Sequence, residues 1–145
     1  MTVAMILKSK GTHVETVRPD VTLQEVVERL AKRRIGAVLV TSATGAILGI
    51  VSERDVVFAL GNAGGIALQR RAEDVMTKDL VTCTREDRAE DLMEMMTKGR
   101  FRHVPVVEDG RLLGIVSIGD VVKRRIEDTD SERAAMRDYI ASAGC

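Results

Sequence analysis

The sequence contains very few aromatic residues: they make up 2% of its 145 residues, as two Phe, one Tyr and no Trp. Proteins that bind single-stranded nucleic acid commonly stack the bases on aromatic side chains, so this scarcity argues against such a function. Hydrophobic residues nevertheless account for 45% of the chain. We therefore expect a core of Val, Leu, Ile, Ala and Met, in a chain about as long as one ordinary domain.

Cysteine and histidine are also scarce. Two cysteines, Cys83 and Cys145, with two histidines, His13 and His103, form neither a disulfide framework nor a recognisable zinc site. The low cysteine content suits a reducing cytoplasm. The serines of the chain lack the Gly-x-Ser-x-Gly surroundings of a catalytic nucleophile, and Cys83 is expected to be a small strand residue. We predict that the protein is not an enzyme and has neither a metal site nor a catalytic cofactor.

The sequence has no long apolar run and no excess of charge of either sign. Met1–Leu7 is apolar but far too short to span a bilayer. Twenty-two basic residues balance 22 acidic ones, so no overall field attracts polyanions. The basic runs Lys32–Arg34 and Lys123–Arg125 lie at expected helix C-termini, where they complement the helix dipole. We expect a cytoplasmic protein that binds neither membrane nor nucleic acid.

One stretch of the sequence occurs twice. Gly49–Val57 returns as Gly114–Val122, with seven of the nine positions identical. Around each copy, β-rich and helical segments follow in the same order. We predict an α/β fold of two β-α-β-β-α repeats packed about a pseudo-twofold axis, with a C-terminal helix. The expected boundaries are 1–65 for the first repeat with the N-terminal segment, 66–127 for the linker and second repeat, and 128–145 for a helical tail.

The predicted elements follow from hydrophobic periodicity and turn residues. In the first repeat they are a short strand at Val14–Val17, a helix that Thr22 and Glu25 cap, a hairpin from Ile35–Thr41 and Ala46–Val51, and a helix starting at Ser52. The second repeat has a strand at Leu80–Cys83, a helix at Arg88–Lys98 ended by Gly99, a hairpin from Phe101–Val107 and Arg111–Val116, and a helix at Ile118–Ile126.

The tail is expected to form a separate amphipathic helix. Between Ser131 and Ser142, apolar residues share one helical stripe: Ala135, Met136, Tyr139 and Ile140. We expect this stripe to dock on the module or on a second copy of the chain.

The repeated stretch could carry chemistry at two positions. Ser52 and Asp55, like Ser117 and Asp120, stand where a strand leads into a helix. A helix N-terminus favours phosphate, a serine hydroxyl can donate to it, and a carboxylate can accept both hydroxyls of a ribose. Ordinary helix capping explains the same spacing without a ligand. The spacing alone therefore leaves a cap and a nucleotide site as alternatives.

Neighbouring basic residues favour an anion site. In the second repeat, Arg100, Arg102 and His103 precede the strand that contains Pro105. Such a group suits a phosphate, although a solvated strand edge would carry similar residues. In the first repeat, Arg54 supplies the positive charge.

These features together resemble a tandem pair of CBS domains, the cystathionine-β-synthase type repeat that forms a Bateman module. The resemblance extends from about Met5 to Ile126. It is carried by the two Gly-Ile-Val-Ser-x-x-Asp stretches and by three further segments: Thr16–Pro19, Asp74–Thr77 and Arg102–Val107. Proteins of this family bind adenosine-containing ligands in clefts between the repeats and often form flat dimers.

The resemblance implies a set of ligand-binding residues. Asp55 and Asp120 would take ribose hydroxyls, Ser52 and Ser117 would contact phosphate or ribose, and Met76 would pack on the adenine. The base would be framed by Thr16, Val17, Ala37, Cys83, Thr84, Val104 and Pro105, and the phosphates would be reached by Arg54, Arg102 and His103. Because Ala37–Leu39 replaces the His-Val-Pro of the second repeat, we expect the two clefts to differ in affinity.

The resulting hypothesis is a regulatory module that senses AMP, ADP or ATP and signals by a conformational change. The partners would be the adenosine-containing ligand, a second copy in a homodimer, and an unknown regulated protein. A sensor of NAD(H) or S-adenosylmethionine and an oligomerisation scaffold without ligand remain alternatives.

Overall fold

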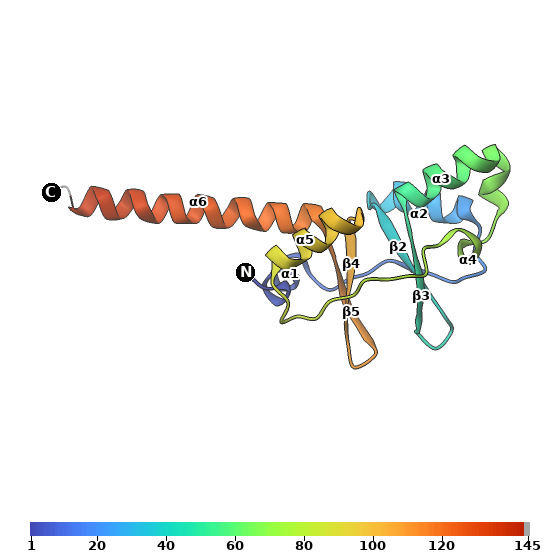
Figure 1. The fold of residues 1–145 in the computed structure, drawn as a ribbon, viewed down its shortest axis with the longest axis horizontal. Coiled ribbons are helices and arrows are strands. Elements are labelled where there is room, and N and C mark those ends of the chain that lie inside the picture. The colour runs from blue at the N-terminus through green and yellow to red at the C-terminus, as the bar shows by residue number, and fades with distance from the viewer. Residues whose placement is uncertain (144–145) are drawn as a thin grey trace.

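In the computed structural model, which describes residues 1–143, two β-hairpins lie side by side and helices pack against each of them (Figure 1). In the first repeat, β1 (Thr16–Val17) pairs parallel with β2 (Ala37–Thr41), which pairs antiparallel with β3 (Ile47–Ser52). Helix α2 (Leu23–Arg33) connects β1 to β2. The first four residues of β2 are buried, which confirms the prediction of a strand covered on both faces.

The second repeat contains the predicted hairpin but a weaker leading strand. Helix α5 (Ala89–Gly99) precedes β4 (His103–Glu108), which pairs antiparallel with β5 (Arg111–Ser117). The prediction of a strand at Leu80–Cys83 is wrong in extent, because only Cys83 forms a bridge, parallel to Val106. The Cys83 amide and carbonyl bond to Pro105 and Val107, at 3.0 and 2.9 Å.

The ends of α2 and α5 show how closely the two repeats match. The Thr22 hydroxyl accepts from the Glu25 amide at 3.2 Å, which confirms the predicted cap of α2. Arg34 and Arg100 end the two helices in the left-handed conformation, with φ of 54° and 57°. Gly99 is therefore the last residue of α5 and not its terminator; its missing side chain makes room for the ring of Phe101.

Each repeat is completed by a segment that precedes the other repeat. The first repeat continues from β3 into α3 (Glu53–Ala63), the 3₁₀-helix η1 (Gly64–Gln69) and α4 (Ala72–Val75), so the linker between the repeats is partly helical. Ala67 and Ala72 of this linker are fully buried in the core of the first repeat. The N-terminal helix α1 (Val3–Lys10) packs against the second repeat, and its residues Val3, Ile6 and Leu7 are buried in the core of that repeat.

Matching backbone hydrogen bonds hold these two exchanged segments. The pairs in the second repeat are Ala89 to Met1, Val3 to Asp87 and Ala4 to Arg85, and the equivalent pairs in the first repeat are Leu23 to Arg70, Ala72 to Val21 and Glu73 to Pro19, donor first, at 2.8–3.1 Å. Leu7 of α1 lies over Gly114 of β5, just as Met76 after α4 lies over Gly49 of β3. A side chain at either glycine would overlap its neighbour.

The two repeats meet through a small apolar cluster. It consists of the buried residues Ala37, Leu39 and Ile50 of the first repeat, packed against partly buried residues that include Leu112 and Ile115 of the second. This contact joins the hairpins into one α/β module.

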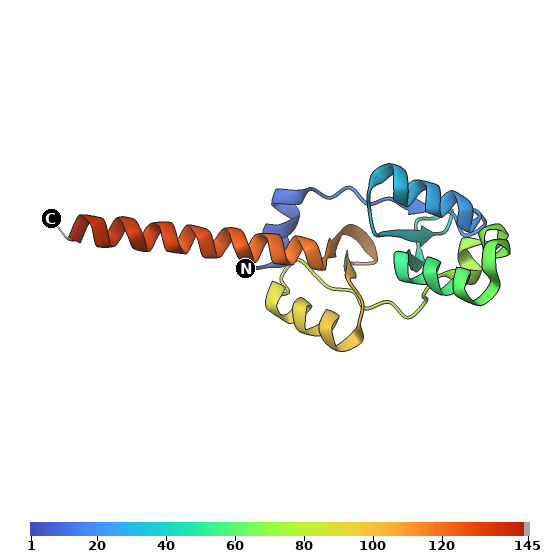
Figure 2. The ribbon, with the colours of Figure 1, turned by 90° about the horizontal axis from the view of Figure 1, so that it is seen from above.

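The last helix, α6 (Ile118–Ala143), is continuous and extends beyond the rest of the molecule (Figures 1 and 2). The prediction of a separate tail helix is therefore wrong, and so is its docking on the module. Met136, Tyr139 and Ile140 are 59%, 70% and 62% exposed. Within residues 1–143, no helix combines the length and the apolar character needed to cross a membrane.

Candidate ligand site at two helix N-termini

The two predicted Ser-x-x-Asp motifs lie at equivalent strand-to-helix junctions. Helices α3 and α6 start near the boundary between the repeats and run in opposite directions from it (Figures 1 and 2). The first amide of each helix donates to the carbonyl of the residue that precedes the paired strand. In the first repeat the Glu53 amide donates to the Gly36 carbonyl, just before β2, at 3.0 Å; in the second the Ile118 amide donates to the Arg102 carbonyl, just before β4, at 2.8 Å.

In the first repeat, Ser52 and Asp55 form a reciprocal cap of α3. The Ser52 amide donates to Asp55 Oδ2 at 2.8 Å, and the Asp55 amide donates to the Ser52 hydroxyl at 3.4 Å. The other carboxylate oxygen, Oδ1, accepts from the Thr77 hydroxyl at 3.0 Å. Both oxygens of Asp55 thus have uncharged donors.

In the second repeat, Ser117 and Asp120 form the same cap, but the carboxylate has a charged partner. The Ser117 amide donates to Asp120 Oδ2 at 2.8 Å, and the Lys10 ammonium reaches the same oxygen at 2.6 Å. Burial raises the pKa of Asp120, but hydrogen bonds from Lys10 and Ser117 more than offset this effect, so the pKa lies below its ordinary value.

Lys10 and Thr77 are site residues that the sequence analysis missed. The Lys10 ammonium also donates to the Ile115 carbonyl at 2.8 Å. In the first repeat the equivalent carbonyl, that of Ile50, accepts from the Thr77 amide at 2.8 Å. Lys10 is the last residue of α1, and Thr77 follows α4. Thr77 lies in the Asp74–Thr77 segment that carries the family resemblance, but no local sequence pattern places either residue beside a carboxylate.

Residues of both repeats meet between the two helix N-termini. Arg54 of α3 donates to the Arg100 carbonyl of the other repeat. Gly36 lies against both Glu53 and His103, so a side chain at Gly36 would come within 3.2 Å of the His103 ring. Burial lowers the pKa of His103, while the Glu53 carboxylate opposes this shift. A ligand bound here would contact both repeats.

Five of the predicted ligand residues have buried side chains: Val17, Ala37, Cys83, Val104 and Pro105. Cys83 and Val104 belong to the core of the second repeat, and Val17 belongs to that of the first. Burial, and then the nearby Asp87 carboxylate, raise the pKa of the Cys83 thiol to about 12. Cys83 is therefore a core residue, and any contact it makes with a ligand has to come from its backbone.

The remaining predicted residues lie at the surface or partly buried. Thr84 is exposed, and its amide donates to the Asp87 carboxylate at 2.8 Å. Thr16 is partly buried, and its carbonyl accepts from Arg29. Arg102 is exposed, whereas Met76 is partly buried over β3.

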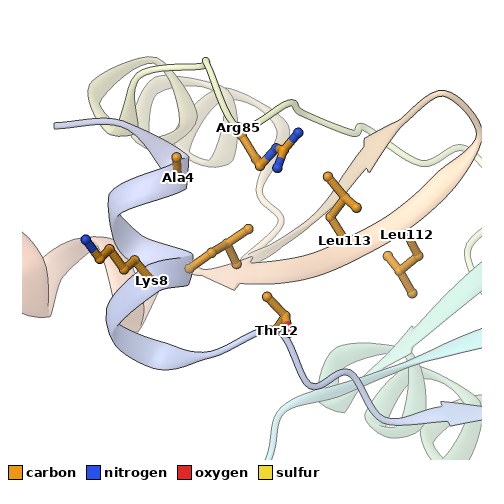
Figure 3. Close-up of a pocket in the computed structure, with 7 residues that line it drawn as sticks. Ala4, Lys8, Thr12, Arg85, Leu112 and Leu113 are labelled. Carbon is orange, nitrogen blue, oxygen red and sulfur yellow. The ribbon is translucent and has the colours of Figure 1, made fainter.

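A hollow of the described surface lies apart from the two junctions. It has a volume of about 570 Å³ and is lined by Ala4, Leu7, Lys8, Thr12, Arg85, Leu112 and Leu113, from α1, β5 and their surroundings (Figure 3). None of these is a predicted site residue, and Arg85 is already bound to the Glu108 carboxylate at 2.7 Å. A second hollow of about 140 Å³ includes Asp55 in its lining.

Residues 1–143 contain no group of three or more His, Cys, Asp or Glu side chains placed to hold a metal ion. The chemistry that the two junctions offer is hydrogen bonding and charge: two carboxylates, two serine hydroxyls, two helix N-termini and the basic residues beside them.

Comparison with known proteins agrees with this architecture. The family model of the CBS domain matches residues 10–62 and 72–127. A mitochondrial CBS domain-containing protein of Arabidopsis thaliana is 31% identical over 147 residues, which cover 96% of this chain and 71% of that protein.

Crystal structures of similar proteins share the fold. A CBS-domain containing protein of Agrobacterium tumefaciens is 51% identical, with a TM-score of 0.84 over 86% of this chain and 92% of that one. A CBS-domain protein of Burkholderia ambifaria is 35% identical, with a TM-score of 0.83 over 88% and 96% of the two chains. The repeated motif, the paired α/β units and these matches confirm the resemblance found in the sequence: the chain belongs to the CBS-domain family and contains two CBS domains in tandem.

Proposed function

We propose that this CBS pair binds an adenosine-containing nucleotide of the AMP, ADP or ATP class and reports its presence to a separate protein. The observation that carries the proposal is the pair of equivalent helix N-termini, each with a serine and a carboxylate, beside residues from both repeats. A helix N-terminus attracts phosphate, and a carboxylate accepts hydrogen bonds from a ribose diol.

The present contacts of the two carboxylates leave room for this role. The Ser117 amide and the Lys10 ammonium both donate to Oδ2 of Asp120, and within residues 1–143 Oδ1 accepts no hydrogen bond. A ribose hydroxyl could donate to this oxygen without breaking the helix cap. At Asp55 a ribose hydroxyl would replace the Thr77 hydroxyl, one uncharged donor for another.

Signalling would follow from the position of the site between the repeats. The contacts from Arg54 to Arg100 and from Gly36 to His103 cross the repeat boundary next to the two helix N-termini. A nucleotide phosphate would compete for Arg54 and approach His103. The ligand would shift the equilibrium between two arrangements of the repeats only if it bound one arrangement more tightly than the other. The regulated partner would be a separate protein, and a homodimer would couple two such modules.

Known structures support an adenosine compound in general terms. The CBS domain pair of protein MJ0100, in complex with 5′-methylthioadenosine and S-adenosyl-L-methionine, has a TM-score of 0.78 to this chain. At 23% identity it shares only the fold. S-adenosylmethionine and NAD(H) are therefore tested beside the nucleotides. The match to an inosine-5′-monophosphate dehydrogenase of Methanocaldococcus jannaschii covers only 22% of that enzyme.

The test is thermal unfolding with AMP, ADP, ATP, NAD⁺, NADH or S-adenosylmethionine. At 100 times its Kd, a ligand of the folded state adds about 2.7 kcal/mol to the free energy of unfolding, which raises the Tm by several degrees. Asp55→Asn and Asp120→Asn are the informative variants, because an amide oxygen can still accept the capping hydrogen bond but carries no charge. If the ligand raises the Tm of the parent but not that of either variant, the ligand binds at these carboxylates.

Two results would overturn the proposal. If no adenosine compound shifts the Tm, the module does not sense this class of ligand and the scaffold alternative gains support. If the shift persists in the double variant with both Asn substitutions, the ligand binds elsewhere. Asp109→Asn, in the turn between β4 and β5, is the matched control for an uncharged substitution outside the site.

A further inference from the structure

The distal end of helix α6 is exposed along its whole described length. Every residue from 129 to 143 is exposed, and both views of the molecule show this part of α6 extending beyond the two repeats (Figures 1 and 2). A single helical segment of this length is only marginally stable in water, because nucleation and chain entropy oppose it. A packing partner would supply the missing stabilisation.

One stripe of α6 has the spacing of a coiled coil, and five of its seven residues are apolar. Alternating steps of four and three residues connect Val122, Ile126, Thr129, Arg133, Met136, Ile140 and Ala143. This is the a and d pattern of a heptad, with Ile126, Arg133 and Ile140 at a. Ile126 is 56% exposed, and Met136 and Ile140 are 59% and 62% exposed. One face of the helix thus presents a stripe that is apolar except at Thr129 and Arg133, and we call this stripe the α6 seam.

The α6 seam faces away from the body of the molecule. After Asp120, the only described residues of α6 that are buried or half-buried are Val121, which is buried in the core of the second repeat, and Arg124 and Asp128, which form an ion pair with each other and have side chains 25% and 39% exposed. In the same heptad these are c and f positions, which lie on the opposite side of the helix from a and d. Two copies could therefore pair along this seam with their bodies on the outside.

Charges beside the seam favour one orientation. Glu132 is at position g and Arg137 at position e of the next heptad. In a parallel two-stranded coiled coil, g of one helix lies beside that e of the other, so Glu132 would pair with Arg137 of the partner subunit. Arg125 and Asp130 stand in the same relation. The a-position Arg133 would lie close to Glu132 of the partner subunit, which compensates its charge.

We propose that the distal half of α6 binds a second copy of this chain as a parallel, in-register, two-stranded coiled coil from Ile126 to Ala143. Ile126, Met136 and Ile140 form the apolar contacts. Thr129 and Arg133 weaken the pairing but fix its register, as polar residues at a and d positions do. This proposal rests on the geometry and charge of α6 alone and is independent of any ligand.

Analytical ultracentrifugation of the full chain over a range of concentrations tests the pairing. Two glutamates in the seam, Met136→Glu with Ile140→Glu, are expected to raise the Kd of self-association at least tenfold and to halve the mass at intermediate concentration. The matched control is Ser131→Glu, which adds the same kind of charge at an f position, away from the seam, and leaves the mass unchanged. The proposal is overturned if the parent chain stays monomeric, or if the variant with Met136→Glu and Ile140→Glu has the same mass as the parent.

Two further variants test the orientation. Glu132→Arg and Arg137→Glu are each expected to weaken association, and the double charge reversal is expected to restore it, because the g–e pairs are then complete again. A single cysteine at the helix end, Ala143→Cys with Cys145→Ser, is expected to form a disulfide-linked dimer on mild oxidation, since d positions face each other in a parallel pair. No restoration and no cross-link would indicate an antiparallel pair and overturn the parallel arrangement.

Discussion

The two CBS domains have the same helix cap, but the donor that binds the capping carboxylate is neutral in the first domain and charged in the second. Asp55 accepts from the Thr77 hydroxyl, at 3.0 Å, whereas Asp120 accepts from the Lys10 ammonium, at 2.6 Å. Lys10 is the last residue of α1 and Thr77 follows α4, so both donors come from the ends of the exchanged segments. The duplicated motif therefore preserves the cap, and the exchanged segment decides the charge around it.

This difference separates two kinds of site. At Asp55 an incoming ribose hydroxyl would replace another uncharged donor, the Thr77 hydroxyl, so no ion pair has to be broken. At Asp120 the protein already supplies a cation, which partly neutralises the carboxylate and places a positive charge where a phosphate could bind. We expect the first junction to favour the ribose and the second to favour a phosphorylated ligand.

The largest effect is expected from the side chains that cover the two strand glycines. Leu7→Ala removes a side chain that is 5% exposed and packs in the core of the second repeat, so it should lower the free energy of unfolding by about 2–5 kcal/mol. Met76→Ala, at the equivalent place over Gly49, should cost less because Met76 is only partly buried. Chemical denaturation measures both changes.

Hydrogen exchange shows which repeat each substitution weakens. Leu7→Ala should lose protection mainly in α5, β4 and β5, whereas Met76→Ala should lose it in α2, β2 and β3. Met5→Ala, on the exposed side of α1, is the control and should change little. Loss of protection in the first repeat on Leu7→Ala would contradict the exchange of segments.

The next effect concerns the caps themselves. Ser52→Ala and Ser117→Ala each remove the acceptor of an Asp amide, and each should cost about 1 kcal/mol of stability. Ser52→Ala should be the more harmful of the two, because the Ser52 hydroxyl also donates to Asp55 at 3.0 Å. Substitution by Gly should cost less than substitution by Ala, as it does at other caps. Equal stability of the parent and both Ala variants in urea denaturation would show that the caps contribute nothing.

A smaller effect is expected from the lysine that binds Asp120. Lys10→Met removes the partly exposed ion pair with Asp120, which is worth about 0.2–1 kcal/mol. Adenosine has no phosphate, so it should bind the freed Asp120 carboxylate about two- to fivefold more tightly. AMP should gain less or bind more weakly, since it loses a cation near its phosphate. Isothermal titration with both ligands measures the difference. An equal change for adenosine and AMP would argue against a distinct role for Lys10.

The smallest effect is a pH dependence from His103. Burial lowers its pKa below the ordinary value of 6.5, so the folded state favours the neutral ring. Its contribution to stability is therefore present above about pH 6.5 and is lost as the pH falls below that value, because the unfolded chain takes up the proton first. Glu53 and Asp120 weaken this effect, whereas Lys10 and Arg102 strengthen it. His103→Gln should flatten this part of the stability–pH curve, and an unchanged slope would show that another group causes it.

Local sequence patterns predicted most of the fold. Thr22 with Glu25 marked the start of α2, and the apolar run in β2 indicated a buried strand; the structure confirms both. The duplicated motif located the two helix caps. These features depend on neighbours within a few residues, so the sequence displays them directly.

The features that were missed depend on distant contacts. Nothing in Met1–Lys10 indicates that this segment packs against residues 83–121, so Lys10 could not be placed beside Asp120. The pattern of alternating strand residues also left open which side chains face the core, and Cys83 and Val104 proved to be buried. The continuous helix α6 was divided in two because its charged middle interrupts the apolar periodicity.

The exchange of segments has a consequence for the order in which the protein is made. Helix α1 is synthesised first, yet its binding surface on α5, β4 and β5 is complete only when residue 121 has been added. The first repeat, by contrast, has all its parts once α4 has emerged from the ribosome. Helix α1 therefore cannot reach its final contacts until the second repeat has been made, and the Lys10–Asp120 ion pair can form only after that.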